Sequence, residues 1–190
     1  MSRLLGQPIH KCFVFPDFDI TIEKFAALGI GPFYVLEEAG GDSIYRGEVH
    51  HMRIKVAFVY DGDNLIEIIA PLGHDQQSTY GEFIRRNPEG GLHHVAYWSQ
   101  DFAKTLAMLQ AEGTPFSIVQ DLKDPRTGNT VEVYCEPVGI ENPVHIQLMR
   151  PGPFDRWFAT MKEAAATWDG NDPIRDARAL MQESLAAVAD

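Results

Sequence analysis

Stretches of alternating apolar and polar residues mark the first half of the chain. Residues 8–15 alternate and are followed by Pro16 and Asp17, which indicates a strand that leads into a helix. We expect Asp17 or Asp19 to cap this helix and Gly29 to end it. Later apolar stretches predict three further strands, at residues 32–38, 52–60 and 65–70. The order is therefore one strand, one helix and three strands.

The second half of the chain repeats this order. A strand at residues 92–98 precedes a helix at residues 101–112, which Gly113 ends. Three more strands are expected near residues 115–120, 130–136 and 143–149. A short helix and a linker at residues 76–91 connect the halves. The pattern predicts an α+β fold of two tandem βαβββ modules, at about residues 7–72 and 91–151.

The two halves also resemble each other in sequence, as expected of a duplication. The segment HKCFVFPDFDITIEKFAALG (residues 10–29) aligns with HVAYWSQDFAKTLAMLQAEG, 84 residues later, and the first and last positions are identical. The stretch IEIIAP (residues 66–71) aligns with IQLMRP (residues 146–151), and both end in proline. We infer that residues 1–151 form one paired domain.

The duplication places ligand-type side chains at equivalent positions, because His10 aligns with His94 and Glu67 aligns with Gln147. Successive side chains of a strand point to opposite faces, so His93 is expected on the packed face opposite His94. A lone buried histidine is more often structural, but four ligand-type residues at equivalent positions favour a site. Imidazole, carboxylate and amide oxygen together suit a divalent ion such as Zn, Ni, Co, Mn or Fe(II). We therefore predict a metal site formed by His10, Glu67, His94 and Gln147.

Composition and charge narrow the class of partner. The 190 residues are 45% apolar and 11% aromatic, which is enough for a folded core. A net charge of −11 and a pI near 5.0 argue against nucleic acid and anionic membranes as partners. Cys12 and Cys135 are too few for a disulfide framework, and no apolar stretch suits a signal peptide or a membrane span. We expect a cytoplasmic protein with a small-molecule substrate.

Three motifs carry a family resemblance. The stretches IHKCFVFPDFD, NLIEIIAPL and GLHHVAYWSQDF resemble the first, fourth and fifth strands of the vicinal oxygen chelate superfamily. This superfamily includes glyoxalase I, methylmalonyl-CoA epimerase, extradiol dioxygenases and the bleomycin- and fosfomycin-resistance proteins. The resemblance covers about residues 7–151. It implies paired modules that curl into a cupped mixed sheet, with a divalent metal on the concave face held by His10, Glu67, His94 and Gln147.

Within that superfamily, the chain is most similar to the glyoxalase I and methylmalonyl-CoA epimerase branch. Those epimerases use His, Gln, His and Glu in chain order, so the Gln and the Glu are exchanged between the modules here. In the relatives the Glu of the second module is both ligand and catalytic base. Gln147 cannot take a proton near neutral pH, so Glu67 is the residue that could inherit the role. The resemblance also implies a homodimer.

The chemistry of this branch is removal of the proton next to a carbonyl, with a metal stabilising the charge. Candidate catalytic residues are Glu67 and His145, since His145 lies two residues before Gln147 and should share its concave face. His50 and His51 fit a surface hairpin better. We predict a divalent-metal-dependent isomerase, epimerase or lyase acting on a small molecule or an acyl-CoA. The alternatives are a metal-dependent extradiol-type dioxygenase and a non-catalytic small-molecule binding protein.

Residues 152–190 extend beyond the paired modules as a predicted helical extension. Residues 153–168 place aromatic side chains at helical spacing, and Asp172 with Pro173 marks a second helix start. We expect two amphipathic helices here. Packing on the outer face of the sheet or on a second copy is favoured over a lid that encloses the substrate.

Overall fold

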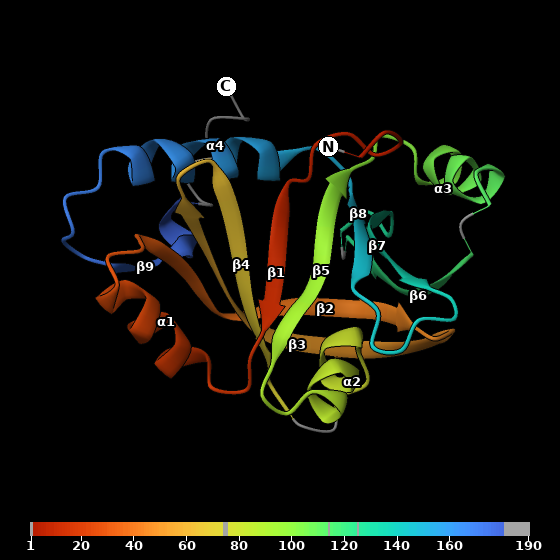
Figure 1. Ribbon diagram of the computed structural model, residues 1–190, viewed down its shortest axis with the longest axis horizontal. Coiled ribbons are helices and arrows are strands. Elements are labelled where there is room, and N and C mark those ends of the chain that lie inside the picture. The colour runs from red at the N-terminus through yellow and green to blue at the C-terminus, as the bar shows by residue number, and fades with distance from the viewer. Residues whose placement is uncertain (1, 74–75, 114, 125, 181–190) are drawn as a thin grey trace.

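The computed structural model describes residues 2–73, 76–113, 115–124 and 126–180 (Figure 1). The first module consists of β1 (His10–Val14), α1 (Phe18–Ala27), β2 (Phe33–Tyr45), β3 (Glu48–Asp61) and β4 (Asn64–Pro71). After α2 (Thr79–Arg86), the second module consists of β5 (Gly91–Trp98), α3 (Phe102–Ala111), β6 (Phe116–Lys123), β7 (Thr130–Pro137) and β8 (His145–Met149). The chain continues with α4 (Pro153–Ala166) and β9 (Ile174–Asp176). The predicted α+β class and the order of elements in both modules are confirmed.

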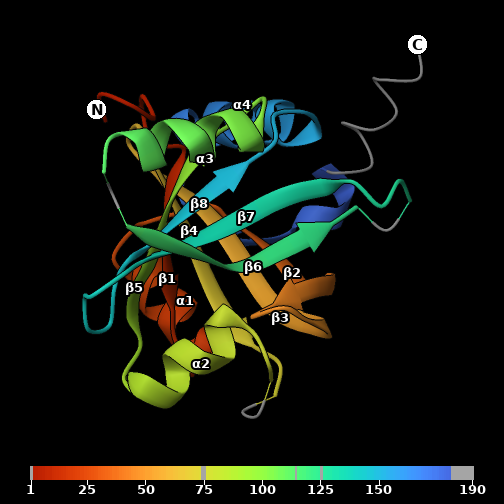
Figure 2. The same ribbon diagram turned by 90° about the vertical axis from the view of Figure 1, so that its right-hand side faces the viewer.

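The strands of the described residues form one mixed sheet, in the order β3-β4-β1-β5-β8-β7-β6-β2-β9. The two modules have the same internal order, β1-β4-β3-β2 and β5-β8-β7-β6. β1 and β5 pair antiparallel and join the modules, and residues 43–45 of β2 pair with residues 120–122 of β6 on the other side. Because β2 also pairs along β3, the module strands close into a ring with an enclosed inner face (Figure 2).

Apolar side chains are buried on both faces of this ring. On the outer face, Phe18 and Ile22 of α1 pack against alternate residues of β2, β3 and β4. Phe102 and Leu106 of α3 cover β7 and β8 in the same way. The inner-face residues form a separate cluster, which also contains Tyr80 of α2. Strands buried on both sides read as nearly continuous apolar runs, which is why alternation is weak in the central strands.

The helix boundaries follow the predicted signals in part. Asp101 caps α3, because its side chain accepts a hydrogen bond of 3.0 Å from the Lys104 N–H. Asp17 precedes α1 in the same way, but its side chain makes no cap hydrogen bond. Gly29 and Gly113 follow the two helices with φ values of +83° and +76°, a conformation that favours glycine. None of the described helices is long and apolar enough to span a membrane.

The helix α4 crosses one end of the ring (Figure 1) and packs on inner-face residues. Trp157 and Phe158 are buried, and the centroid of the Trp157 ring lies 5.3 Å from that of Phe58 on β3. The Phe158 ring lies 6.2 Å from the ring of His10. The expectation that this helix packs on the outer face of the sheet is therefore wrong, and a contact with a second copy stays a prediction. An amphipathic pattern shows that one face is buried, but it does not say against what.

The segment after α4 begins with a strand rather than with the expected second helix. β9 pairs in parallel with residues 33–35 of β2, and the Phe33 N–H donates a hydrogen bond of 2.8 Å to the Pro173 carbonyl. β6 pairs only with residues 43–45 of β2, so β9 covers an edge of β2 that would otherwise lack partners. Helical structure begins at Ala177. Residues 181–190 of the expected helix lie outside the described residues.

Candidate metal centre

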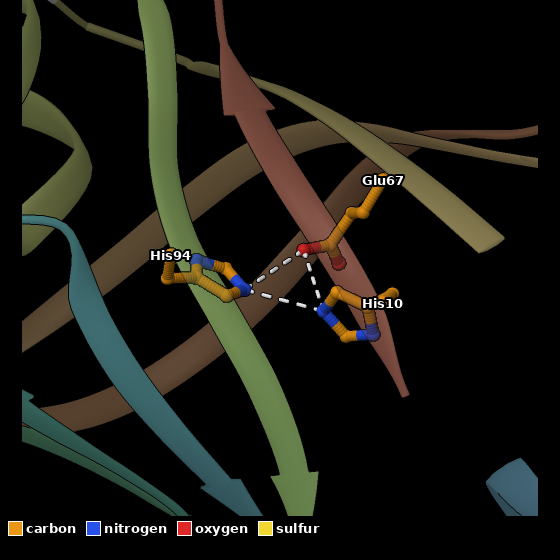
Figure 3. Close-up of side chains that lie close together, drawn as sticks. All are labelled: His10, Glu67 and His94. Atoms are coloured by element: carbon orange, nitrogen blue, oxygen red, sulfur yellow. Dashed lines mark hydrogen bonds and ion pairs between the residues drawn. The ribbon is translucent and has the colours of Figure 1, made fainter. Parts of the chain in front are cut away.

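Three buried side chains converge on one point of the inner face (Figure 3). The Nε2 atoms of His10 and His94 are 3.2 Å apart, and each lies 3.3 Å from Oε2 of Glu67. Ligand atoms that each lie about 2.0–2.2 Å from one ion are themselves about 3.0–3.5 Å apart. The three atoms therefore have the spacing of one face of a coordination sphere. In the part of the chain that the structure describes, they are the one group of His, Cys, Asp or Glu side chains found with metal-ligand spacing.

The register of three neighbouring strands brings these residues together. Cys12 of β1 lies opposite Glu67 of β4 on one side and opposite His94 of β5 on the other. Residues that face each other on neighbouring strands point to the same side of a sheet. Cys12 is fully buried in the inner-face cluster, so that side is the inner face. His10 precedes Cys12 by two residues and shares its face.

Burial and charge favour the protonation states that a metal requires. Burial raises the pKa of Glu67, but His10 and His94 beside it outweigh burial and hold the pKa well below its usual range. Burial lowers the pKa of His94 to about 4, although the Glu67 carboxylate opposes this change. An ionised carboxylate and a neutral imidazole are the forms that bind divalent ions.

Gln147, the fourth predicted ligand, lies on the adjacent strand β8. Its partner on β5 is Ala96, two residues after His94. Its Nε2 donates hydrogen bonds of 2.9 Å to the Glu132 carboxylate and 2.6 Å to the Tyr134 hydroxyl. These bonds set the orientation of the amide and leave Oε1 buried without a hydrogen-bond partner. Two imidazole nitrogens, a carboxylate oxygen and an unsatisfied amide oxygen fit a divalent cation.

A cavity of about 450 Å³ lies beside these residues. Its polar wall includes Glu67, Glu132 and Gln147. The other walls are mainly apolar and come from β2, β3, β8 and α4. This volume and this mixture are typical of small-molecule sites, in which apolar walls bind the ligand and a few polar groups orient it. Phe154 and Trp157 of α4 line the cavity, so the C-terminal segment forms part of its wall.

Glu132 on β7 is a candidate functional residue that the sequence analysis missed. It alternates with Tyr134, and its carboxylate accepts hydrogen bonds from Gln147 and from the Tyr134 hydroxyl, the latter at 3.1 Å. Burial raises the pKa of Glu132, and the negative charge of Glu67 raises it further. Glu132 is thus a second carboxylate on the cavity wall, separate from the convergent trio.

The duplication explains why Glu132 was missed. The registers of β3 with β4 and of β7 with β8 place Val56 in the first module where Glu132 lies in the second. The repeat indicates only ligand-type residues that occur in both modules, and the counterpart of Glu132 is a valine. Alternation with Tyr134 on the predicted strand was the signal that could have indicated it.

His93 and His94 contact each other, contrary to the expectation that they point to opposite faces. The register between β1 and β5 passes from the pair Cys12–His94 to the pair Phe13–Leu92, so His93 is the extra residue of a β-bulge. His93 is fully buried, and its Nδ1 lies 2.9 Å from Nδ1 of His94. The bulge breaks the strict alternation on which the expectation rested.

His145, a predicted catalytic residue, does not line the cavity that contains Glu67 and Gln147. Its ring stacks on His93, with centroids 4.7 Å apart and planes inclined by 22°. It lines a separate small pocket beside α2, together with Phe83 and other residues. Burial lowers its pKa. His145 therefore lies behind His93, because the bulge places the His93 ring against it.

Fold and site together define a protein of paired βαβββ modules with a candidate divalent-metal centre on the inner face of the sheet. The family model described as Glyoxalase/Bleomycin resistance protein/Dioxygenase superfamily matches residues 9–134, which is more than half of the chain. The chain belongs to this superfamily, which confirms the resemblance to vicinal oxygen chelate proteins. A comparison with curated proteins finds no match.

Several solved structures share the fold. Methylmalonyl-CoA epimerase from Mycobacterium tuberculosis is 18% identical, with a TM-score of 0.53 over 82% of this chain and 95% of that chain. A variant of the Streptomyces coelicolor methylmalonyl-CoA epimerase, in complex with 2-nitronate-propionyl-CoA, is 19% identical, with a TM-score of 0.51 over 78% of this chain and 96% of that chain. A hypothetical protein from Bacillus halodurans is 16% identical, with a TM-score of 0.52 over 77% of this chain and 94% of that chain. At these identities the similarity shows a common fold.

Proposed function

We propose that the protein is a divalent-metal-dependent isomerase, epimerase or lyase that removes the proton next to a carbonyl in a small molecule or an acyl thioester. One observation carries the proposal. The convergent trio His10, Glu67 and His94 lies beside a cavity that also presents a second carboxylate, Glu132, which is not part of the trio. Membership of the superfamily and structural similarity to methylmalonyl-CoA epimerases support it.

The chain's own side chains divide into two roles. His10, Glu67, His94 and the free Oε1 of Gln147 are the proposed metal ligands. A bound divalent ion would supply positive charge that stabilises the negative charge developing on the substrate oxygens. The mainly apolar walls of the cavity strengthen such electrostatic effects, because they lower the local dielectric constant.

Glu132 is the proposed general base. Its carboxylate is held by Gln147 and Tyr134 on the cavity wall, where it can reach a bound substrate. Glu67 is better suited to bind a metal than to accept a proton, because its two histidine neighbours keep its carboxyl group ionised. His145 lies outside the cavity. Of the two bases expected from the sequence, we therefore retain Glu67 as a ligand and assign proton transfer to Glu132.

The cavity limits the part of the substrate that the protein encloses. A volume of about 450 Å³ accommodates a small carbonyl compound or the acyl end of a larger thioester. The apolar walls contributed by Met52, Ile54 and Trp157 favour an uncharged substituent next to the carbonyl.

Exchange of substrate hydrogen with solvent deuterium tests this function. We expect the metal-loaded protein to incorporate deuterium next to the carbonyl in at least one member of a panel of acyl-CoAs, hemithioacetals and small ketones. A Glu132→Gln change should slow this exchange about 10²- to 10⁴-fold, because it removes the proton acceptor, without lowering the metal content. Glu112→Gln is the matched control, since Glu112 pairs with Arg3 on the surface and does not line the cavity. Absence of exchange across the panel, or full exchange in Glu132→Gln, contradicts the proposal.

A dioxygenase is the second candidate, because two histidines and one carboxylate also form the ligand set of non-haem Fe(II) oxygenases. It predicts oxygen consumption when the Fe(II)-loaded protein is mixed with catechols. Oxygen consumption without deuterium exchange would favour the dioxygenase over the isomerase. If the protein binds no stoichiometric divalent ion after reconstitution, both the isomerase and the dioxygenase proposals are wrong. Non-catalytic binding of a small molecule would then be the remaining function.

A further inference from the structure

We infer that His93 is a positioning residue, which holds His94 in the tautomer and the orientation that metal binding requires. The inference rests on the proposed metal centre. His94 has two ring nitrogens with different neighbours: Nε2 faces His10 and Glu67, whereas Nδ1 faces Nδ1 of His93 at 2.9 Å. The contact between the two histidines is fully buried.

The positions of the protons follow from this arrangement. A neutral imidazole carries one proton, so a His94 that presents the Nε2 lone pair to an ion has its proton on Nδ1. That Nδ1–H then donates a hydrogen bond to His93, and Nδ1 of His93 must be the acceptor. The proton of His93 is therefore on its own Nε2, which is buried without a hydrogen-bond partner. Ligating histidines generally have such a hydrogen-bond partner on the nitrogen that does not bind the metal.

The surroundings of His93 hold its ring in place. The ring stacks on His145, and its centroid lies 4.9 Å from that of Tyr80 and 5.2 Å from that of Phe83. Both aromatic residues belong to α2, the helix that follows the first module. The β-bulge places residue 93 beside His94, whereas regular alternation would direct it to the outer face. The bulge thus supplies a rigid acceptor next to a proposed ligand.

The first module has no equivalent partner. The residue that aligns with His93 is Ile9, whose side chain cannot accept a hydrogen bond. Nδ1 of His10 is buried without a hydrogen-bond partner. The two repeat-equivalent histidines are therefore held differently, and we expect His94 to be the more rigid of the two.

Binding of Zn²⁺ alone to the metal-free protein tests the inference, with calorimetry as the readout. His93→Leu removes the acceptor and should weaken Zn²⁺ binding about 10- to 100-fold. His93→Asn places an amide oxygen near the position of Nδ1 and should restore affinity to within a few-fold of the unchanged protein. His51→Leu is the control, because it removes an exposed histidine that pairs with Asp42 and does not belong to the proposed centre; its affinity should match that of the unchanged protein. Thermal unfolding of each metal-free variant measures any purely structural loss.

Long-range ¹H–¹⁵N spectra of the unchanged Zn²⁺-loaded protein give an independent readout that needs no variant. We expect the proton of His94 on Nδ1 and that of His93 on Nε2. A His93 that carries its proton on Nδ1, or a His93→Leu protein that binds Zn²⁺ as tightly as the unchanged one, overturns the inference and leaves the proposed function standing. An unchanged protein that binds no divalent ion overturns the metal centre and the inference together.

Discussion

Individual residues of the inner face depend on neighbours that differ between the two modules. Gln147 is oriented by Glu132 and Tyr134, and the Tyr134 hydroxyl in turn bonds the Tyr80 hydroxyl at 2.6 Å. Glu67, its repeat equivalent, is instead oriented by two histidines. Equivalent positions in the two modules can therefore differ in role, because the hydrogen-bond partners of each side chain set its orientation and its charge.

Removal of one hydroxyl tests the orientation of Gln147. A Tyr134→Phe change leaves the amide with Glu132 as its remaining partner, so Oε1 is held less firmly. We expect a loss of about 1–2 kcal/mol in the free energy of unfolding, measured with urea, because buried partners become unsatisfied. Zn²⁺ affinity should fall a few-fold. Tyr80→Phe is the control, since it leaves both partners of Gln147 in place; equal losses of Zn²⁺ affinity in the two variants would contradict this role.

At the scale of elements, charged side chains link α2 to strands of both modules. Arg46, at the turn between β2 and β3, contacts Glu82 of α2 at 2.9 Å and Glu136 of β7 at 3.1 Å. The Tyr45 hydroxyl also donates a hydrogen bond to Glu82. α2 carries the rings that pack on His93, so these ion pairs hold the helix against the histidine pair.

The pH dependence of the free energy of unfolding should show the contribution of the ion pair between Arg46 and Glu82. Burial raises the pKa of Glu82, but Tyr45 and Arg46 outweigh burial and lower it overall. A carboxyl with a lowered pKa stabilises the folded state above its unfolded pKa of about 4.3, and this contribution is lost as the pH falls through the folded pKa. Arg46→Met should therefore cost about 1 kcal/mol near pH 7, a small value because the Arg46 side chain is 43% exposed.

Urea unfolding at pH 7 and at about pH 3.5 gives the comparison, because below about pH 4.3 the unfolded carboxyl takes up a proton before the folded one does, so the stabilisation shrinks. The difference between Arg46→Met and the unchanged protein should shrink at the lower pH. Arg53→Met is the control, because Arg53 pairs with Glu38 on an exposed surface and should change little at either pH. A difference of the same size at both pH values would indicate lost packing rather than lost charge.

In the whole molecule, the two modules close into a ring around the inner face, and α4 packs across one end. The ring closes through three residue pairs between β2 and β6, while β1 and β5 bring His10 and His94, the candidate histidine ligands of the two modules, side by side. A metal at the proposed centre would bridge the two modules, since His10 and Glu67 belong to the first and His94 to the second. The homodimer that the resemblance implies remains a prediction.

Metal binding should therefore stabilise the entire fold. At a free Zn²⁺ concentration about 100 times the dissociation constant, the free energy of unfolding should rise by about 2.7 kcal/mol. The melting temperature should rise by several degrees in a scanning calorimeter and return when a chelator is added. His10→Ala should lose most of this shift, whatever its own stability. A full shift in His10→Ala would place the bound ion elsewhere.

Much of the fold could be predicted because its signals are local or repeated. Alternation and turn residues indicate strands, and the alignment of His10 with His94 and of Glu67 with Gln147 indicated a shared face. The trio does converge in space. Glu132 was not predicted, because its counterpart in the first module is Val56. β9 was not predicted either, because Asp172 and Pro173 indicate a helix start and do not show that an edge of β2 needs a partner.

The sequence by itself determined the modules, the order of their elements and the four candidate ligands, because periodicity and repetition are properties of the chain. Only the tertiary structure decided that a bulge turns His93 towards His94, that Gln147 keeps a free oxygen while Glu132 and Tyr134 hold its nitrogen, and that α4 closes the inner face. These features depend on the register between strands that are distant in sequence. A shift of one residue in that register changes which side chains contact each other, and the local sequence pattern does not specify the register.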